Sequence, residues 1–409
     1  MIAVIADDIT GAAEIAAIGW RRGLSAQVQM TPNPKAGADL VTIDTDTRSL
    51  PGDTARSILK DIAGRLRALP VQWHFKKVDS VLRGNVGAEL ETLMEALGKR
   101  RTILAPANPS KGRIIVDGRY YINGVPLDET EFAQDPEHPA RSSSIADLLS
   151  ASSGGSLKSP GAPGDLGMAG PGEPFPKPAL RSSLRLPPAL HVLDPAAYLG
   201  EETGIVVAQA RTVADLAQWS GCLDDDTLAA GGADFFQAIL DRRSPSHQTG
   251  TRDMLRPTKA PKLFVCGSKR RAGSQPAHVD MPVCLMPERA PGLLGQWTSD
   301  IVTALAASRC AVVAVGRAAE RNSLSALDVR TRMAVTVQRV VERTEIGELF
   351  IEGGATASAI LRRLGWDTLD VQGEYAPGVV RLAVTKMPDR TVTLKPGSYP
   401  WPEELLTLT

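Results

Sequence analysis

The chain has 409 residues, of which 43% are apolar, and its 46 basic residues balance its 46 acidic ones. This length can hold two domains, each with its own hydrophobic core. Zero net charge excludes the broad basic surface with which proteins bind nucleic acid or anionic membranes, although it still allows a local basic pocket for a small anion.

The sequence also lacks the usual signs of export. No window of about 18 residues is apolar throughout, so we expect no membrane span. The apolar run at the N-terminus is short and has no charged leader, unlike a signal peptide. The four cysteines are scattered, which favours neither a disulfide framework nor a structural zinc site. We therefore expect a cytoplasmic protein with reduced thiols.

Residues 1–150 alternate short apolar strands with helical stretches. The apolar run Ile2–Ala6 precedes a helix over 11–23, and a second strand ends at Asp44. Apolar residues spaced four apart predict a helix over 54–69, and a strand follows over 72–78. This alternation predicts an open, mostly parallel sheet flanked by helices, the α/β class.

The segment 113–127 breaks this rhythm. Asp117-Gly118 and Asn123-Gly124 are two hairpin signals, because type I′ turns need residues that accept a positive φ. We predict a small antiparallel excursion here that forms a flap over a site.

Two polar stretches divide the rest of the chain. Residues 150–190 are rich in Ser, Gly and Pro, a composition that buries too little surface to fold alone, so we expect a flexible insertion. The stretch 246–261 is predicted to link an N-terminal domain, 1–245, to a C-terminal domain, 262–409. The second domain starts a new α/β series and is also expected to be an open sheet flanked by helices.

Several predicted strands end in polar residues or glycines. In the first domain these ends are Asp7-Asp8, 44–48 and 77–80, and in the second they are 267–268, Gly353-Gly354 and 395–398. Ligands of open α/β sheets bind beyond the carboxyl ends of the strands. The division predicts two ligands that meet in a cleft between the domains.

The polar ends of the first domain favour a small polyhydroxy acid. In "FKKVDSVLRGNVGAEL", Lys77, Asp79, Ser80 and Arg83 crowd a strand end and the start of a helix, where a cation and the helix N-terminus both suit a carboxylate or phosphate. Arg48 in "DTDTRS" suits a carboxylate bidentately. Each loop alone is equally well explained as a solvated loop, with Arg48 paired to a neighbouring aspartate.

The polar ends of the second domain favour phosphate. "LFIEGGATASAILRRLG" places Gly353 and Gly354 between a strand and a helix, where backbone N–H groups can approach an anion and Thr356 can cap it. "FVCGSKRR" and "TLKPGSYPW" repeat a turn of small residues beside a cation. A tight strand–helix turn is the alternative for the first of these segments, but three such turns favour a nucleotide phosphate chain.

The chain resembles the four-carbon acid sugar kinase family over nearly its full length. The resemblance is carried, in the family's order, by "IADDITGAAE", "KKVDSVLRGNVGAEL", "APANPSKGR", "VDGRYYINGVPLDETEFAQDP" and "EGGATA". It implies an ATP-dependent kinase with an acid-sugar domain followed by a nucleotide domain. The nucleotide side departs from the family pattern at "GSKRRAGSQPAHV" and "KPGSYPWP", a difference that concerns the ATP contacts rather than the reaction.

The resemblance also implies roles for individual residues. The residues implied to bind the sugar acid are Asp8, Arg48, Lys77, Val78, Asp79 and Ser80. The residues implied to contact ATP are Ser268, Gly353, Gly354, Pro396, Gly397, Ser398 and Tyr399, and the pattern above adds Thr356. Mg²⁺ would bridge the phosphates, with no spacing that identifies its protein ligands.

Phosphoryl transfer asks a protein mainly to position groups and neutralise charge. Asp8 is the candidate that orients the attacking hydroxyl and accepts its proton, with Asp7 second, while Lys77 and Arg83 steady the substrate carboxylate or the migrating phosphoryl group. A plainer role is that one aspartate caps the following helix. An aspartate-nucleophile phosphatase is disfavoured, because neither Ile9 nor Thr10 supplies the second aspartate it needs.

A non-catalytic sensor of sugar acids and nucleotides is the alternative function, supported by the altered turns of the second domain. The expected partners are a small sugar acid and ATP, with no nucleic acid and no membrane. A homodimer is one arrangement that the sequence leaves open.

Overall fold

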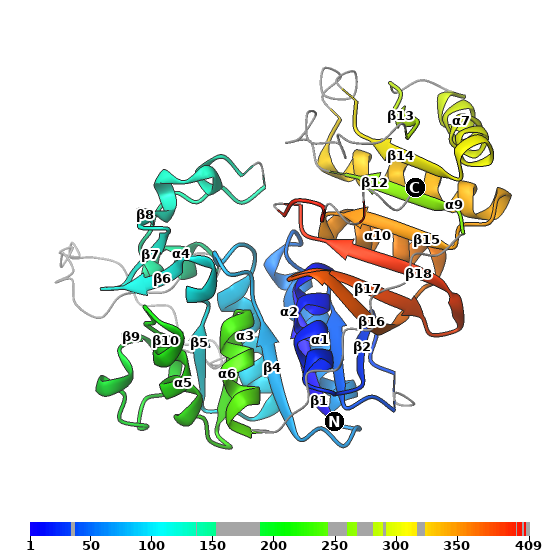
Figure 1. Ribbon diagram of the computed structural model, residues 1–409. Coiled ribbons are helices and arrows are strands. Elements are labelled where there is room, and N and C mark those ends of the chain that lie inside the picture. Colours follow the sequence, from blue (N-terminus) through cyan, green and yellow to red (C-terminus); the bar gives the residue numbers. More distant parts are fainter. Residues whose placement is uncertain are drawn as a thin grey trace, which may run out of the picture.

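Figure 1 shows the computed structural model of the chain. The structure describes residues 1–33, 37–135, 137–152, 189–243, 260–267, 281–288, 292–316, 324–397, 399–402 and 405. Most of the predicted 150–190 insertion and of the 246–261 linker, together with Ser268 and Ser398, lies outside the described residues. The N-terminal half below means residues up to 243, and the C-terminal half means residues from 260 on.

Eight strands of the N-terminal half form a parallel sheet in the order β2-β3-β1-β4-β11-β5-β10-β9. Their bounds are β1 (Ile2–Ala6), β2 (Ala26–Gln29), β3 (Leu40–Asp44), β4 (Trp73–Lys77), β5 (Arg101–Ala105), β9 (Leu190–Leu193), β10 (Gly204–Ala208) and β11 (Thr227–Gly231). β1, β3, β5, β10 and β11 are buried along their whole length, as expected where helices cover both faces of a parallel sheet.

The helices of this half form two packed groups. α1 (Ile9–Arg21), α6 (Ala233–Arg243) and α5 (Val213–Gly221) pack in series, and α2 (Gly52–Leu66), α3 (Val86–Leu97) and α4 (Ile145–Ser152) form the other group. Short 3₁₀ turns complete the half at η1 (Pro109–Lys111), η2 (Leu127–Glu129), η3 (Glu131–Gln134) and η4 (Pro195–Ala197). The predicted helix over 54–69 is confirmed as α2 with a shifted start and end.

The C-terminal half repeats the plan on a smaller scale. Its parallel strands lie in the order β13-β14-β12-β15-β18, with bounds β12 (Lys262–Cys266), β13 (Val283–Leu285), β14 (Cys310–Ala314), β15 (Glu348–Glu352) and β18 (Met387–Lys395). The helices α7 (Leu293–Ser308), α9 (Ala326–Arg343) and α10 (Gly354–Leu364) pack in series, and α10 also contacts α1. The predicted α/β class is therefore confirmed in both halves.

An antiparallel pair of strands joins the two halves. β16 (Thr368–Ala376) and β17 (Val379–Val384) extend the sheet from β18, and β16 then pairs with β2. The result is one sheet of fifteen strands, visible in Figure 1 where the orange β16 and β17 meet the blue N-terminal elements. The sequence analysis did not predict β2, β16 or β17.

The antiparallel excursion is confirmed. β6 (Arg113–Val116), β7 (Arg119–Ile122) and β8 (Val125–Pro126) form a separate three-stranded sheet. Its turns have positive φ at both central positions, 50° and 71° at Asp117-Gly118 and 49° and 81° at Asn123-Gly124, as type I′ turns require. In the described part of the chain, none of the helices is both long and apolar enough to cross a membrane.

Candidate active site

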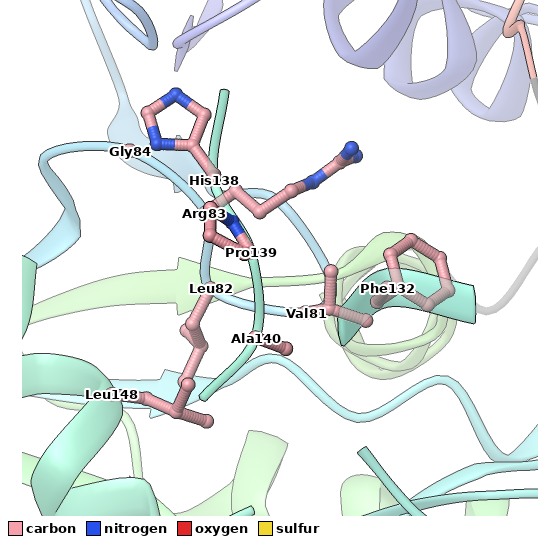
Figure 2. A pocket seen from close by; sticks show the side chains of 9 residues that line it. All are labelled: Val81, Leu82, Arg83, Gly84, Phe132, His138, Pro139, Ala140 and Leu148. Atoms are coloured by element: carbon pink, nitrogen blue, oxygen red, sulfur yellow. The ribbon is translucent and has the colours of Figure 1, made fainter. Parts of the chain in front are cut away.

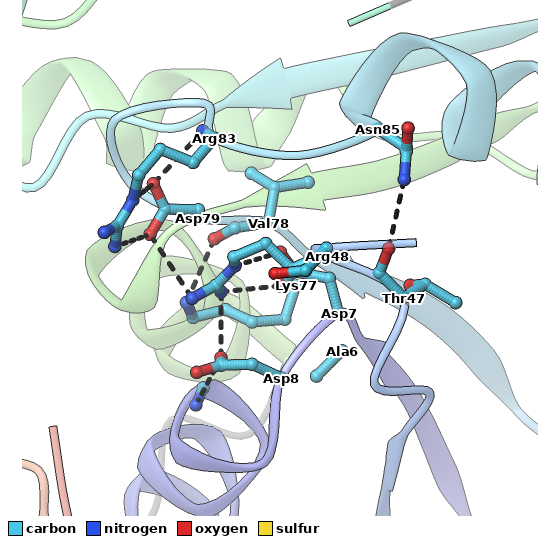
Figure 3. A network of polar contacts seen from close by, with 12 residues as sticks. Ala6, Asp7, Asp8, Thr47, Arg48, Lys77, Val78, Asp79, Arg83 and Asn85 are labelled. Carbon is cyan, nitrogen blue, oxygen red and sulfur yellow. Dashed lines mark hydrogen bonds and ion pairs between the residues drawn. The ribbon is translucent and has the colours of Figure 1, made fainter. Parts of the chain in front are cut away.

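The register of the sheet brings three polar strand ends together. Ala6, the last residue of β1, pairs with Asp44 of β3 on one side and with Lys77 of β4 on the other. Strands that follow β1 in the chain lie on both sides of it, and the carboxyl end of such a strand is where open α/β sheets bind their ligands. The predicted residues Asp7, Asp8, Arg48, Val78 and Asp79 all emerge at this edge (Figure 3).

Arg48 is the centre of the charge network at this edge. Its Nε and Nη2 donate to Asp7 Oδ2 and Oδ1 at 2.7 and 3.0 Å, and Nη2 forms an ion pair with Asp8 Oδ1 at 2.9 Å. Burial lowers the pKa of Arg48, but Asp7, Asp8 and Asp79 outweigh it and hold the pKa well above its ordinary value. Arg48 is thus a fixed cation, paired with these carboxylates rather than with Asp44 or Asp46.

Asp8 caps α1, which confirms the plainer role for one aspartate of the pair. Its Oδ1 accepts from the Gly11 backbone N–H at 2.9 Å, and its Oδ2 accepts from Thr10 Oγ1 at 2.5 Å. Burial raises the pKa of Asp8, but Arg48, Lys77 and these hydrogen bonds bring it below the ordinary value. Asp8 therefore stays ionised at neutral pH while it caps the helix.

Asp79 and Arg83 form a second fixed pair. Arg83 Nε and Nη2 donate to the two carboxylate oxygens of Asp79 at 2.9 and 2.7 Å, and Arg83 Nη1 donates to Asp135 at 3.1 Å. Burial raises the pKa of Asp79, but Arg83 and Arg48 dominate and lower it. The Nη1 of Arg48 lies 3.9 Å from Asp79, so the two pairs form one network.

Lys77 and Ser80 have partners that the sequence did not predict. Lys77 Nζ donates to the Val78 carbonyl at 3.0 Å and lies 3.7 Å from Glu14 of α1. Ser80 accepts a hydrogen bond from Arg113 of the excursion. Glu14 also accepts from Lys111 Nζ at 2.7 Å. Glu14 and Lys111 lie within "IADDITGAAE" and "APANPSKGR", so those motifs held the signal.

A cavity of about 140 Å³ opens next to this network (Figure 2). Its lining residues are Val81, Leu82, Arg83, Gly84, Phe132, His138, Pro139, Ala140 and Leu148. Phe132 packs its ring against the guanidinium groups of Arg83 and Arg113, each 5.5 Å from the ring centroid. The excursion and η3 thus contact the edge of the site.

The strand ends of the C-terminal half present backbone and small residues at Gly267 and Gly353, beside a buried ion pair at the ends of β15 and β18. Gly353 has φ 94°, and α10 begins at Gly354. A Cβ on Gly267 would lie 2.2 Å from Thr356 Oγ1, so these two predicted strand ends touch. Lys395, at the end of β18, pairs with Glu352 at 3.1 Å.

Lys395 also holds the turn that carries the predicted contacts Pro396, Gly397 and Tyr399. Its Nζ donates to the carbonyls of Pro396 and Tyr399 at 3.0 and 2.5 Å. The hydroxyl of Tyr399 meets Lys111 of the other half at 2.6 Å. The turn is therefore fixed by both halves.

The two strand edges meet directly. A Cβ built on Gly354 would lie 2.5 Å from Asp8 Oδ2, which places the start of α10 against the carboxylate that caps α1. Asp44 makes a second contact, because its Oδ2 accepts from Ser358 Oγ of α10 at 2.8 Å and its carbonyl accepts from Arg362 at 3.0 Å. Burial, with Asp46 nearby, raises the pKa of Asp44 to about 7.

Comparison with known families decides the classification. Residues 2–239 match the model of a sugar-binding N-terminal domain, and residues 270–399 match that of a nucleotide-binding C-terminal domain. The chain belongs to the four-carbon acid sugar kinase family. The charged edge described above lies in the sugar-binding part, and the glycine-rich edge lies in the nucleotide-binding part.

Relatives within the family match over nearly full length. A D-threonate kinase of Salmonella typhimurium is 27% identical over 97% of this chain and 94% of its own length. A 3-oxo-tetronate kinase of Methylobacterium radiotolerans is 26% identical over 97% and 95%. A solved structure from Haemophilus influenzae, 18% identical with a TM-score of 0.65, covers 97% of this chain and 96% of its own and shares the fold.

Proposed function

We propose that this chain is an ATP-dependent kinase that phosphorylates a hydroxyl of a four-carbon sugar acid, such as a tetronate or 3-oxo-tetronate. The contact between Asp8 and the start of α10 carries the proposal. It sets an ionised carboxylate, which suits a hydroxyl, against a helix N-terminus with two glycines, which suits a phosphate group. The relatives reported above bear kinase names and give no support to the non-catalytic sensor.

In this proposal Asp8 orients the attacking hydroxyl and takes its proton late in the transfer. A carboxylate with a lowered pKa is a weak base, but the loose transition state of phosphoryl transfer asks for little proton abstraction before the bond forms. Asp7 acts through Arg48, whose Nε and Nη2 it holds in place. Two adjacent aspartates thus do different work, because one faces the substrate and the other fixes the cation.

The remaining side chains of the edge bind the sugar acid. Its carboxylate is met by the positive charges of Lys77, Arg83 and Arg48. Asp79 accepts hydrogen bonds from its hydroxyls, and Ser80 can donate to them or accept from them. Asp79 and Arg83 already pair with each other, so their geometry is set before the acid binds. Such preorganisation lowers the cost of ordering side chains on binding.

The C-terminal edge would hold the nucleotide. Gly353, Gly354 and Thr356 would meet the phosphates, and the turn with Pro396, Gly397 and Tyr399 would contact the rest of ATP, as proposed for Ser268 and Ser398 too. ATP supplies the phosphoryl group, and Mg²⁺ neutralises its charge. Among the described residues no group of three or more His, Cys, Asp or Glu side chains is placed to hold a metal. Mg²⁺ commonly binds one or two carboxylates plus phosphate oxygens, so it does not need such a group.

We also propose that the kinase acts in the cytoplasm. All four cysteines are free thiols, which fits a reducing compartment. Its substrates are small molecules, and a homodimer is compatible with the proposal without being required by it.

The decisive experiment is ADP release with ATP and Mg²⁺ across a panel of four-carbon sugar acids. Turnover on one acid, lost in Asp8→Asn with an unchanged Tm, supports the kinase and names its substrate. ATP binding without turnover on any acid of the panel contradicts the four-carbon assignment.

A further inference from the structure

Two lysines, one from each half, hold Tyr399. Lys395 of the C-terminal half binds its carbonyl, and Lys111 of the N-terminal half binds its hydroxyl at 2.6 Å. Lys111 Nζ also lies 5.0 Å from the centroid of the Tyr399 ring. A Cβ on Gly378, in the β16–β17 turn, would lie 2.7 Å from Cε2 of the ring. The ring thus contacts both the hairpin and Lys111.

Lys111 is tied in turn to the charged edge of the N-terminal half. Its Nζ donates to Glu14 Oε1 at 2.7 Å, and the other oxygen of Glu14 lies 3.7 Å from Lys77. The side chains of Lys111 and Glu14 are only 27% and 16% exposed. Burial lowers the pKa of Lys111, but Glu14 and Tyr399 outweigh it and raise the pKa, so the lysine is a charged donor.

We propose that Lys111 is a positioning residue that couples the sugar-acid edge to the nucleotide edge. With Glu14 and Tyr399 it forms what we call the interdomain clasp. The clasp fixes the Tyr399 turn of the nucleotide side against α1, the helix that Asp8 caps. This inference rests on the proposed function, because the coupling matters only if both edges bind substrates.

The clasp predicts a specific kinetic signature. Lys111→Met removes one of the two lysine contacts that fix the Tyr399 turn, so KM for ATP should rise about tenfold, the usual cost of a lost hydrogen bond to a charged group, while kcat changes much less. Tyr399→Phe keeps the ring and removes only the hydroxyl, so it should act in the same direction. The double variant should have the same KM for ATP as Lys111→Met, because both changes break the same contact between Lys111 and Tyr399.

Two further variants separate positioning from general stability. Lys111→Arg keeps a charged donor within reach of Glu14 and Tyr399 and should restore most of the affinity for ATP. Gln27→Met is the matched control, because it breaks another contact between the halves, the hydrogen bond that Gln27 Nε2 donates to Asp370 Oδ1 at 2.7 Å where β2 pairs with β16. Gln27→Met should leave KM for ATP unchanged.

The experiment measures KM for ATP, kcat and Tm for these variants of the full chain, together with the Kd for ATP by calorimetry. Unchanged KM and Kd in Lys111→Met, or additive effects in the double variant, would overturn the clasp. If the wild type binds ATP but phosphorylates no acid, the proposed function fails alone, and the Kd values still decide the clasp. A wild type that binds no ATP overturns both.

Discussion

The two strand edges that meet at the site are built on opposite principles. The N-terminal edge gathers side-chain charge, with Arg48 and Arg83 each locked between carboxylates. The C-terminal edge is shaped by missing side chains, because Gly267 and Gly354 stand where a Cβ would meet Thr356 or Asp8. Charge that is ordered in advance suits a small polyhydroxy acid, whereas exposed backbone suits a phosphate chain. Substitutions should therefore damage the two edges by different mechanisms.

The largest effect is expected from removing one charge at the N-terminal edge. Asp8→Asn keeps an N-cap residue, since asparagine caps helices as well as aspartate, but it loses the ionised acceptor. We expect kcat to fall by about 10²–10⁴-fold, the usual contribution of a positioned acid–base group. ADP release measures the loss, and circular dichroism checks the fold. Activity close to wild type would remove Asp8 from the chemistry.

A second carboxyl group at this edge, that of Asp44, should affect stability rather than rate. The pKa of Asp44 is raised to about 7, so the folded state holds a proton that the unfolded chain, with an ordinary aspartate pKa, has already lost. Stability from this group is present at low pH and decreases as pH rises from about 4 to about 7, by at most about 4 kcal/mol. Asp44→Asn should flatten this slope.

The measurement is the urea midpoint of wild type and Asp44→Asn at pH 5 and pH 8. The variant should gain relative to wild type at pH 8 and not at pH 5. An equal difference at both pH values would show that Asp44 is ionised throughout, held by Arg362.

The C-terminal edge should respond to added bulk. Gly354→Ala places a Cβ 2.5 Å from Asp8 Oδ2, so the carboxylate or α10 must move. Displacements of about 1 Å in a site cost on the order of 10²-fold in rate, and we expect a loss of that size in kcat/KM. Gly64→Ala is the matched control in α2, where nothing lies within 4 Å. Gly64→Ala should keep full activity and become slightly more stable. An equal loss of activity in both variants would show that the steric contact with Asp8 is not the cause.

The smallest effect is expected where the same ion-pair chemistry is exposed. Asp61 and Arg65 pair at 2.8 Å on α2, with side chains 60% and 52% exposed. Exposed pairs of this kind contribute about 0.3–0.5 kcal/mol, so Asp61→Asn should barely shift the urea midpoint. A large shift of the urea midpoint would mean that this exposed pair contributes as much to stability as the buried ion pairs of Arg48.

The sequence predicted which residues lie at the two strand edges, because that signal is local. Apolar runs that end in Asp7-Asp8, in Lys77 or in Gly353-Gly354 mark strand ends, and parallel strands bring their carboxyl ends to one edge. The partners across that edge carry no local mark. Nothing near Lys111 indicates Tyr399, and nothing near Asp8 indicates Gly354, because those contacts depend on how the halves join.

The junction itself was missed for the same reason. β16 mixes apolar and charged residues, and its burial alternates irregularly, with register shifts near Gly373 and Glu374. β2 has four residues, fewer than a pattern needs to stand out. Neighbouring strands supply their hydrogen-bond partners, β3 and β16 for β2, and β17 and β2 for β16. Tertiary context therefore decided what local propensity left open.

The pairing of β2 with β16 has a consequence for how the chain is made. β2 is one of the two edge strands of the N-terminal half, β9 being the other, and residues 368–370 cover it by pairing with it. A ribosome releases those residues late, so a nascent chain that has already folded its N-terminal half would carry an uncovered edge strand, a template for misassociation. Truncation before Thr368 would make that exposure permanent. Synthesis of the C-terminal half thus protects the first half as well as completing the site.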